Sequence, residues 1–454
     1  MKRIIIAIIL LAFPIAANST QVSGDVWGVW DSTMNPIEVV GELRVPPDSS
    51  LIIGPGCYIE FQDYYALTVD TSAAFIRAIG TEQDSVFFTS APGRVWNGID
   101  IFFADTTCEF SYCVLERSYA PTEDPMESGG AIYCWQTNLD IKNCRITNNR
   151  AESGVGGGIY FYNGDFYLSN SDISNNFCAF GGSGVYFYYG SAILINNLFK
   201  NDTTYYPLGG EDSGPVECRG CSLLTFNGNI VRNNLSCGMS TIYFRADFAS
   251  INNNIIFSNI AWGGRSGLYI TINDSGYVAN NKIAHNGDIY SGGGTGGGMC
   301  LIGSNIRANN NIIAHNAVWP YGGGTYLLGT NIVLTNNVIA NNWAYSNAGG
   351  IYIDNTSMQS PNILINNIIW GNVAPSNPQI FNEGNRPLEV SYCDVEGGWQ
   401  GVGNIDIDPL FRDTANGDFH LVSTFCGDPY DSPCIDVGDP AIQDYLLDCD
   451  WGLG

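Results

Sequence analysis

The sequence predicts an all-β solenoid: a single-stranded parallel β-helix of about 28 residues per coil. The main observation is a pair of asparagines, Asn-x4-Asn, that recurs nine times between Asn143 and Asn372. The eight intervals between first members cover 224 residues, a mean of 28. A period of this size marks coils that bury their apolar faces only by stacking on one another. The first members of the pairs are Asn143, Asn170, Asn196, Asn229, Asn254, Asn281, Asn311, Asn337 and Asn367.

A second repeat, just before each asparagine pair, predicts one strand in every coil. Its residues alternate with period two, as in Ile132-Tyr133-Cys134-Trp135. Two columns of this strand are apolar at almost every coil, so we expect both to point into the core. The columns are Ile132, Ile159, Val185, Val216, Ile242, Leu268, Met299, Thr325 and Ile351, and Cys134, Phe161, Phe187, Cys218, Phe244, Ile270, Leu301, Leu327 and Ile353.

The residues between these strands show no helical periodicity. Three short β-segments per coil, joined by Gly- and Asn-rich bends, account for the repeat better than a strand and a helix. Asparagine suits the bends because it tolerates a left-handed backbone. Stacked Asn amides can also hydrogen-bond from one coil to the next. We therefore expect coils about 4.8 Å apart with asparagines at their corners.

The amino-terminal residues 1–19 are expected to be a cleaved export signal. Lys2 and Arg3 precede an apolar stretch of 14 residues, Ile4 to Ala17, which is too short to span a bilayer. No later stretch is long and apolar enough to do so. We expect a mature chain with no transmembrane span, a monomer that is secreted or held on the outer surface of a bacterium.

The charge balance excludes some partners. The net charge is −26, with 44 acidic and 18 basic residues, which disfavours nucleic acid and anionic lipid. Between Asp394 and Asp450 there are 12 aspartates, and Arg412 is the only Lys or Arg.

Fourteen cysteines in an exported chain predict disulfides. Cys113 and Cys144 align one coil apart, and Cys426 and Cys434 flank a short loop, so these are the two candidate pairs. The Cys218-x-x-Cys221 sequence resembles half a zinc site, but no second half accompanies it.

The column between the two buried ones is expected to face outward. It carries tyrosine at seven of nine coils and predicts a groove for a polysaccharide or another cell-surface component. A purely structural alternative is that tyrosine stacks well on itself in strands. The predicted ligand-binding residues are Tyr133, Trp135, Tyr160, Tyr162, Tyr186, Tyr188, Tyr243 and Tyr269. The segment Thr203–Pro215 is expected to form a loop that walls this groove.

The same face offers a possible catalytic set. Arg219 and Arg245 on adjacent coils, with Glu217 beside them, could act on an acidic glycan by β-elimination. Alternatively, Glu217 only neutralises the arginines. Hydrolysis is disfavoured because the outward columns offer only Glu217 and Asp354, five coils apart.

Several segments resemble a known family. Gly-Gly-Ala-Ile strands with Ile-Thr-Asn-Asn bends, the stretches Val45–Gly56 and Ile79–Ser90, and a closing segment with Ile407–Phe411 and Ser432–Pro440 resemble exported right-handed parallel β-helix proteins of the pectate-lyase-like fold. The repeats are also similar to those of chlamydial polymorphic outer-membrane proteins. The resemblance implies the fold, not an activity, because this fold carries lyases, hydrolases and adhesins. No lyase signature of the family is matched.

The resemblance and the repeats together divide the chain. Residues 20–128 should form an amino-terminal cap and opening coils, 129–390 the regular coils, and 391–454 an acidic carboxy-terminal cap that covers the open end. Relatives often continue into a sorting or anchoring domain, so we expect either a truncated gene model or a released protein.

Two weaker metal signals remain. Asp406, Asp408, Asp413 and Asp418 could hold Ca²⁺, although an ordinary Asn-Gly turn explains the last two equally well. His285 and His315 fall at the same place on adjacent coils, where polar bend residues are usual and two ligands make a poor metal site. No other cofactor is expected.

Overall fold

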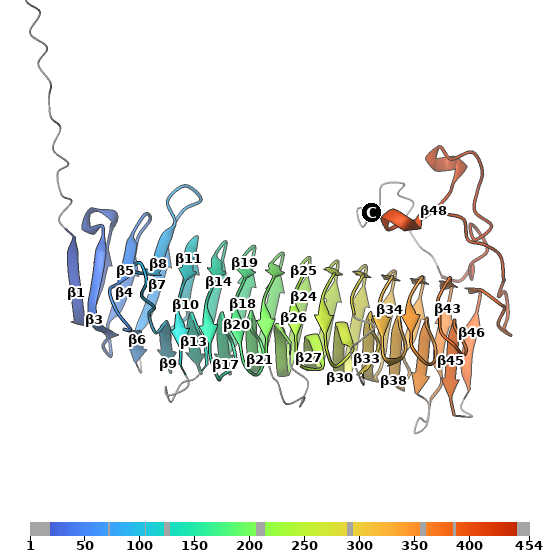
Figure 1. Cartoon of the computed structure of the whole chain (residues 1–454), viewed down its shortest axis with the longest axis horizontal. Coiled ribbons are helices and arrows are strands. Elements are labelled where there is room, and N and C mark those ends of the chain that lie inside the picture. Colours follow the sequence, from blue (N-terminus) through green and yellow to red (C-terminus); the bar gives the residue numbers. More distant parts are fainter. Residues whose placement is uncertain are drawn as a thin grey trace, which may run out of the picture.

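The chain forms one rod of stacked coils, seen from the side in Figure 1. The computed structural model describes residues 19–70, 73–104, 106–121, 128–205, 214–287, 294–354, 360–384 and 387–442. They make about 13 turns of about 27 residues. Parallel pairing joins each coil to the next, so that Ile132 pairs with Ile159, 159 − 132 = 27 residues on. The predicted all-β parallel β-helix is confirmed. Residues 1–18 of the expected export signal lie outside the described residues.

Each coil contributes strands to three faces of the rod. The first face holds β6 (Leu67–Asp70), β9 (Ile99–Phe102), β13 (Ile132–Trp135), β17 (Ile159–Tyr162), β33 (Met299–Ser304), β38 (Thr325–Thr330), β42 (Ile351–Asp354) and β45 (Ile380–Glu383). The second face holds β2 (Gly28–Trp30), β4 (Ser50–Ile53), β7 (Phe75–Ile79), β10 (Cys108–Ser111), β14 (Leu139–Lys142), β18 (Asp165–Ser169), β34 (Ile306–Asn309), β39 (Val333–Thr335), β43 (Asn362–Ile365) and β46 (Leu388–Ser391).

The third face is made of short strands at every coil. It holds β5 (Tyr58–Phe61), β8 (Val86–Ser90), β11 (Cys113–Glu116), β15 (Arg145–Thr147), β19 (Asp172–Ser174), β22 (Leu198–Lys200), β25 (Ile230–Arg232), β28 (Ile255–Phe257), β31 (Lys282–Ala284), β35 (Ile312–Ala314), β40 (Val338–Ala340), β44 (Ile368–Trp370) and β47 (Asp394–Val395).

Six strands bend around a corner and serve two faces. Those that join the third face to the first are β1 (Thr20–Asp25) and β3 (Ile37–Val45), and those that join the first to the second are β21 (Val185–Ile195), β24 (Val216–Asn227), β27 (Ser240–Asn252) and β30 (Arg265–Ala279).

Shorter elements complete the coils. A small parallel sheet contains β12 (Tyr119–Ala120), β16 (Arg150–Ala151), β20 (Phe177–Cys178), β23 (Thr203–Thr204), β26 (Leu235–Ser236) and β29 (Ile260–Ala261). Two further parallel pairs are β32 (Gly294–Thr295) with β37 (Pro320–Tyr321), and β36 (Ala317–Val318) with β41 (Trp343–Ala344). The remaining elements are the strands β48 (Phe411–Asp413) and β49 (Asp418–Leu421) and the 3-10 turns η1 (Ser32–Met34), η2 (Thr414–Asn416) and η3 (Thr424–Cys426).

The core follows the two predicted columns. Ile132, Ile159 and Val185 pair in register, as do Cys134, Phe161 and Phe187. Nearly all members of both columns are fully buried, and they belong to one continuous apolar cluster. Stacked side chains of the same kind fill the interior because each coil places its residue directly over the last.

Buried asparagines form two hydrogen-bonded ladders along the inside corners. Asn254 Oδ1 accepts from the backbone N and Nδ2 of Asn229, at 2.8 and 3.2 Å. Asn254 Nδ2 in turn donates to the Phe226 carbonyl and to Asn281 Oδ1, at 2.9 and 2.8 Å. Every polar atom of the amide is therefore satisfied inside the rod. The first ladder contains Asn197, Asn229, Asn254, Asn281, Asn311, Asn337 and Asn367, and the second contains Asn149, Asn176, Asp202, Asn234, Asn259, Asn286, Asn316, Asn342 and Asn372.

The structure corrects the alignment of the first three asparagine pairs. Asn143, Asn170 and Asn196 are left-handed bend residues, with φ of 54°, 50° and 56°. The ladder position is the next residue, which is Cys144, Ser171 or Asn197. The sequence repeat therefore mixed two adjacent positions, because asparagine suits both the bend and the ladder.

The carboxy-terminal segment both closes the rod and folds back along it. Ile405 pairs with the last coil, since its carbonyl accepts from Val395 N at 3.0 Å. The chain then returns along the third face, visible as the red segment above the orange coils in Figure 1. There Phe419 of β49 packs on Ile312, Ala314 and Ala340. Part of the segment that was expected to cap the end of the rod therefore packs against its third face instead.

Candidate functional site

The first face carries two columns of side chains that point away from the core. The strand pairing confirms both predicted registers through β13, β17 and β21. The column nearer the bend, here the inner tyrosine column, holds Tyr133, Tyr160, Tyr186, Glu217, Tyr243, Tyr269, Cys300, Tyr326 and Tyr352. The other, here the outer aromatic strip, holds Trp135, Tyr162, Tyr188 and the adjoining Tyr189.

The inner tyrosine column lies outside the core but is largely buried, which corrects the expectation of an exposed face. Tyr133, Tyr243 and Tyr269 are 7%, 6% and 6% exposed. The glycine bend before the strand lies against the tyrosine, and a Cβ at Gly129 would come within 2.8 Å of Tyr133 Cβ. Burial is the main cause that raises the pKa of Tyr160, to about 12. Tyr160, Tyr186 and Tyr326 are half-buried, so this column is a second packed layer with some partly exposed members.

Stacking along the rod completes that layer. The rings of Tyr133 and Tyr160 are 4.8 Å apart and nearly parallel, at 11°. Tyr160 and Tyr186 follow at 5.7 Å and 6°. Tyr243, Tyr269 and Cys300 form a separate buried cluster further along. The structural alternative, that tyrosine stacks on itself, therefore explains the inner tyrosine column.

The outer aromatic strip stays half-exposed. The Trp135 and Tyr162 rings stack at 3.9 Å and 9°, and Tyr162 and Tyr188 lie 5.7 Å apart. Tyr189 continues the strip 4.1 Å from Tyr188 and is 45% exposed. It was not among the predicted residues, because it occupies a left-handed bend position, with φ 61°, just after the strand pattern ends.

Stacking limits which parts of these rings a ligand can touch. Trp135 and Tyr162 cover one another's flat faces, so they offer ring edges and the phenol hydroxyl to solvent. Tyr189 stands at 90° to Tyr162 and breaks the stack. Tyr189 in turn packs on Tyr188, and a Cβ at Gly220 would come within 2.8 Å of the Tyr189 ring. Tyr189 is nevertheless the most exposed member of the strip, at 45%.

The buried Glu217 and the partly exposed Arg219 form an ion pair just beyond the outer aromatic strip. Glu217 is fully buried, accepts from Arg219 Nε through Oε1, and lies 3.4 Å from the Gly214 backbone N through Oε2. The Arg219 guanidinium also lies over the Tyr243 ring, 5.0 Å from its centroid. Burial lowers the pKa of Arg219, but the charge and hydrogen bond of Glu217 outweigh it and raise the pKa overall.

The predicted catalytic set does not form a common reactive site. Glu217 is enclosed and engaged by Arg219, so it is not positioned to take a proton from a polymer. Arg245 is exposed, and the register of β24 and β27 shifts between Cys218 and Cys221, where the two arginines would otherwise stack. The alternative interpretation, in which Glu217 only neutralises an arginine, holds for Arg219. Most of the predicted groove wall, residues 206–213, lies outside the described residues.

The calcium candidates are engaged in local turns. Asp413 caps η2 by accepting from Asn416 N, and Asp418 Oδ1 accepts from His420 N at 3.0 Å. Asp406 and Asp408 accept from the backbone N of Gly397 and Leu410, each at 3.0 Å. Across the described ranges, no three His, Cys, Asp or Glu side chains converge as a metal site. The interpretation as an ordinary Asn-Gly turn accounts for residues 413–418.

The two predicted disulfides are not formed. Cys113 and Cys144 do align one coil apart, but both are buried free thiols, and Cys144 Sγ accepts from Cys113 N at 3.3 Å. Sulfur here takes the place that an Asn oxygen takes in later coils. Cys434 is also a free thiol and donates to Asp394 Oδ2 at 3.0 Å, so it does not pair with Cys426.

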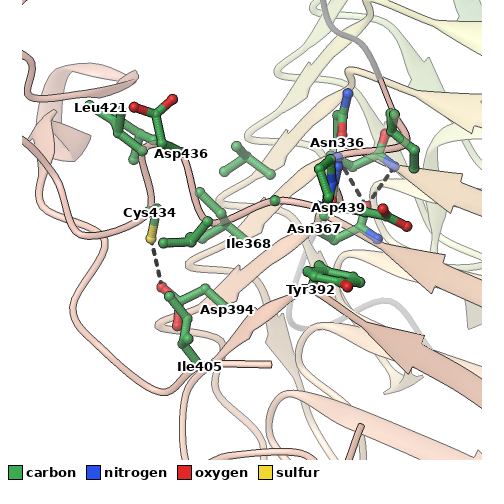
Figure 2. Close-up of a pocket in the computed structure, with 18 residues that line it drawn as sticks. Asn336, Asn367, Ile368, Tyr392, Asp394, Ile405, Leu421, Cys434, Asp436 and Asp439 are labelled. Carbon is green, nitrogen blue, oxygen red and sulfur yellow. Dashed lines mark hydrogen bonds between the residues drawn. The ribbon is translucent and has the colours of Figure 1, made fainter. Parts of the chain in front are cut away.

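The folded-back segment creates a cavity that the sequence did not reveal. It measures about 610 Å³ and lies between the coils around Asn337 and Asn367 and the residues from Cys434 to Ile442. Figure 2 shows Asp436 near Leu421 at one end, and Asp439 beside Asn367 and above Tyr392 at the other. Burial is the main cause that raises the pKa of Asp394 at its floor.

Comparison with known proteins identifies the class. A family model described as a right handed beta helix region matches residues 130–264 and 214–402, more than half of the chain. The chain therefore belongs to the right-handed β-helix family, as its resemblance implied. No curated protein and no solved structure gives a match to this chain. Within the described ranges, no helix is both long and apolar enough to cross a bilayer.

Proposed function

We propose that this chain is an exported or cell-surface β-helix protein that binds an extended polysaccharide along its outer aromatic strip, without catalysis. The observation that carries this proposal is the continuous, half-exposed and uncharged aromatic surface from Trp135 to Tyr189, held on a rigid stack of strands. The amino-terminal sequence supports export, through Lys2, Arg3 and the apolar stretch that follows.

A linear polymer fits the shape of this surface. Successive rings lie 3.9 and 5.7 Å apart along the rod, so neighbouring units of a chain laid along the axis meet equivalent positions. The Tyr hydroxyls and the Trp135 indole N–H can hydrogen-bond sugar hydroxyls, and the exposed part of the Tyr189 ring, 45% of this residue, can pack on sugar C–H groups. Because the strip is already ordered, binding costs little conformational entropy.

The charges nearby support binding over β-elimination. The Glu217 carboxylate and the Arg219 guanidinium neutralise each other next to the strip. A lyase needs a base and a cation free to meet the uronate. The proposed ligand is therefore a neutral or weakly charged glycan. The alternative ligand is another cell-surface component with similar chemistry.

Affinity electrophoresis in gels that contain neutral or acidic polysaccharides tests the proposal. The parent chain should be retarded by at least one polymer, and Trp135→Ala and the double variant Tyr188→Ala/Tyr189→Ala should each lose most of that retardation. The matched control is Tyr345→Ala, which removes a tyrosine that is 48% exposed elsewhere on the rod. Unchanged retardation in both strip variants would remove the site. Release of unsaturated uronate products by the parent chain would instead identify a lyase.

A further inference from the structure

A second cavity, of about 260 Å³, lies between the third face and the folded-back hairpin. Its β-helix wall comes from β28, β31 and the bends that follow β31 and β35, and its other wall from η2 and β49. The outer aromatic strip is on the first face, so this cavity is a separate site. The side chains that matter here are Phe257, Lys282, His285, His315 and Phe419.

Basic groups converge in this cavity although the protein is strongly acidic. Two of its three histidines line the cavity, in a chain of net charge −26 with only 18 Lys and Arg. The Lys282 ammonium reaches the turn of the hairpin, where a Cβ at Gly417 would be 3.7 Å from Nζ. No carboxylate in the described parts of the chain forms an ion pair with Lys282. The nearby Asp418 instead pairs with His420.

The two histidines are fixed by the coil geometry. They occupy the left-handed bend position on adjacent coils, with φ of 55° and 54°, and their rings stack at 4.8 Å and 7°. His315 Nε2 lies 3.0 Å from the Thr414 carbonyl. A carbonyl only accepts, so this nitrogen carries the proton and ties the bend to the hairpin.

Part of the cavity lining is apolar. Phe257 and Ala284 come from the β-helix, and Phe419 comes from the hairpin, with its ring 5.6 Å from that of His315. A concave site with apolar walls and a few convergent polar groups is the usual form of a small-molecule site.

The pKa shifts of Lys282 and His285 show that the cavity disfavours their cationic forms while no anion is bound. Burial lowers the pKa of Lys282, and the charge of Asp418 opposes that shift. Burial, followed by the charges of His315 and Lys282, lowers the pKa of His285. A bound anion would offset these costs, because an opposite charge at this distance favours the cationic forms.

We propose that this cavity binds a small organic anion with an apolar body, such as an aryl or alkyl carboxylate. Its carboxylate meets Lys282 and the histidine pair, and its body lies between Phe257 and Phe419. The site exists only while the hairpin is docked, since η2 and β49 supply one wall. The proposal does not depend on glycan binding by the first face.

Isothermal titration of the whole protein with benzoate tests the site. Benzoate should bind, and its neutral counterpart benzyl alcohol should bind at least about ten-fold more weakly, as expected when a charge contact contributes about 1.4 kcal/mol. Lys282→Met should weaken benzoate binding by about the same factor. Lys200→Met is the matched control, because it removes a lysine from the same face several coils away, and it should leave benzoate binding unchanged.

Two further measurements keep the test decisive. His285 is exposed, so His285→Ala should preserve folding while it weakens benzoate binding several-fold. Inorganic phosphate should bind more weakly than benzoate, because it cannot use the apolar wall. The proposal is overturned if benzoate does not bind, or if benzyl alcohol or phosphate binds as tightly as benzoate. It is also overturned if neither Lys282→Met nor His285→Ala weakens benzoate binding.

Discussion

The inside corners and the outer first face of this rod obey different constraints. Along the first ladder the same residue type occurs at seven successive coils, from Asn197 to Asn367, all nearly or fully buried. The outer aromatic strip instead gives way to Arg219 within one coil. A ladder amide must satisfy partners on two neighbouring coils, whereas an outer side chain need only fit beside its neighbours. Stability is thus concentrated inside, and variation that can serve binding lies outside.

The largest effect should come from breaking a ladder. Asn254→Ala removes one hydrogen bond from each of four buried groups: the Asn229 backbone N, Asn229 Nδ2, the Phe226 carbonyl and Asn281 Oδ1. Asn229 Nδ2 keeps the Leu194 carbonyl and Asn281 Oδ1 keeps the backbone N of residue 254. At about 1 kcal/mol for each buried group, we expect a loss of about 4 kcal/mol in the free energy of unfolding. Urea denaturation measures it, and a loss below about 1 kcal/mol would contradict the role given to the ladder.

A stabilising change is expected at Asp202, the one carboxyl in the second ladder. Its Oδ1 accepts from Asn176 N and Nδ2, but Oδ2 is buried without a partner at the place where other members donate. Burial is the main cause that raises the pKa of Asp202 well above its usual value. The folded chain therefore holds a proton that the unfolded chain releases above about pH 4.

The sign of the pH effect follows from this difference. Because folding takes up a proton, the unfolding free energy falls as pH rises, by up to about 1.4 kcal/mol per unit. Asp202→Asn removes that loss and restores a donor, so it should stabilise the protein, and the gain should be larger near pH 7 than near pH 5. Denaturation at several pH values measures the gain. A gain that does not change with pH would contradict a protonated Asp202.

A smaller effect should separate the two columns of the first face. Tyr269 is 6% exposed and Tyr162 is half-buried. Tyr269→Ala should cost about 3 kcal/mol, and Tyr162→Ala about 1 kcal/mol, because less apolar area is lost at the outer position. Thermal melting of both variants checks the order. Equal costs would mean that the outer aromatic strip is as structural as the inner tyrosine column.

The smallest effect is expected at Arg245. This side chain is exposed, so Arg245→Ala should change stability by less than about 0.5 kcal/mol. Arg219→Ala is the comparison, since it leaves the buried Glu217 without its guanidinium and should cost several-fold more. Similar losses of stability in the two variants would contradict the conclusion that Arg219 is held in an ion pair while Arg245 is exposed.

The repeat predicted the coils because every coil solves the same packing problem. Ile132, Ile159 and Val185 reveal their common inward direction through alternation alone. The ladder was harder to place, because Cys144 and Ser171 take the amide position in the early coils while Asn143 and Asn170 occupy the bends. A one-residue offset of this kind is visible only when backbone angles are known.

The errors concern contacts between segments. Alternation showed that Tyr243 points away from the core, but its burial depends on neighbouring coils and on the glycine bends. The docking of Phe419 on Ala314 and Ala340 joins residues that no periodicity relates. Cys113 and Cys144 were assigned to a disulfide because they align one coil apart in an exported chain, whereas they serve as buried packing and hydrogen-bonding groups.

The Asn ladders also bear on how such a rod can change its size. Each amide needs only an identical partner above and below, so the pattern has no preferred position along the axis. A duplicated or deleted unit of about 27 residues, cut at the same bend, would leave every remaining amide paired. The molecule can therefore grow or shrink in steps of one coil, each about 4.8 Å, without any redesign of its interior.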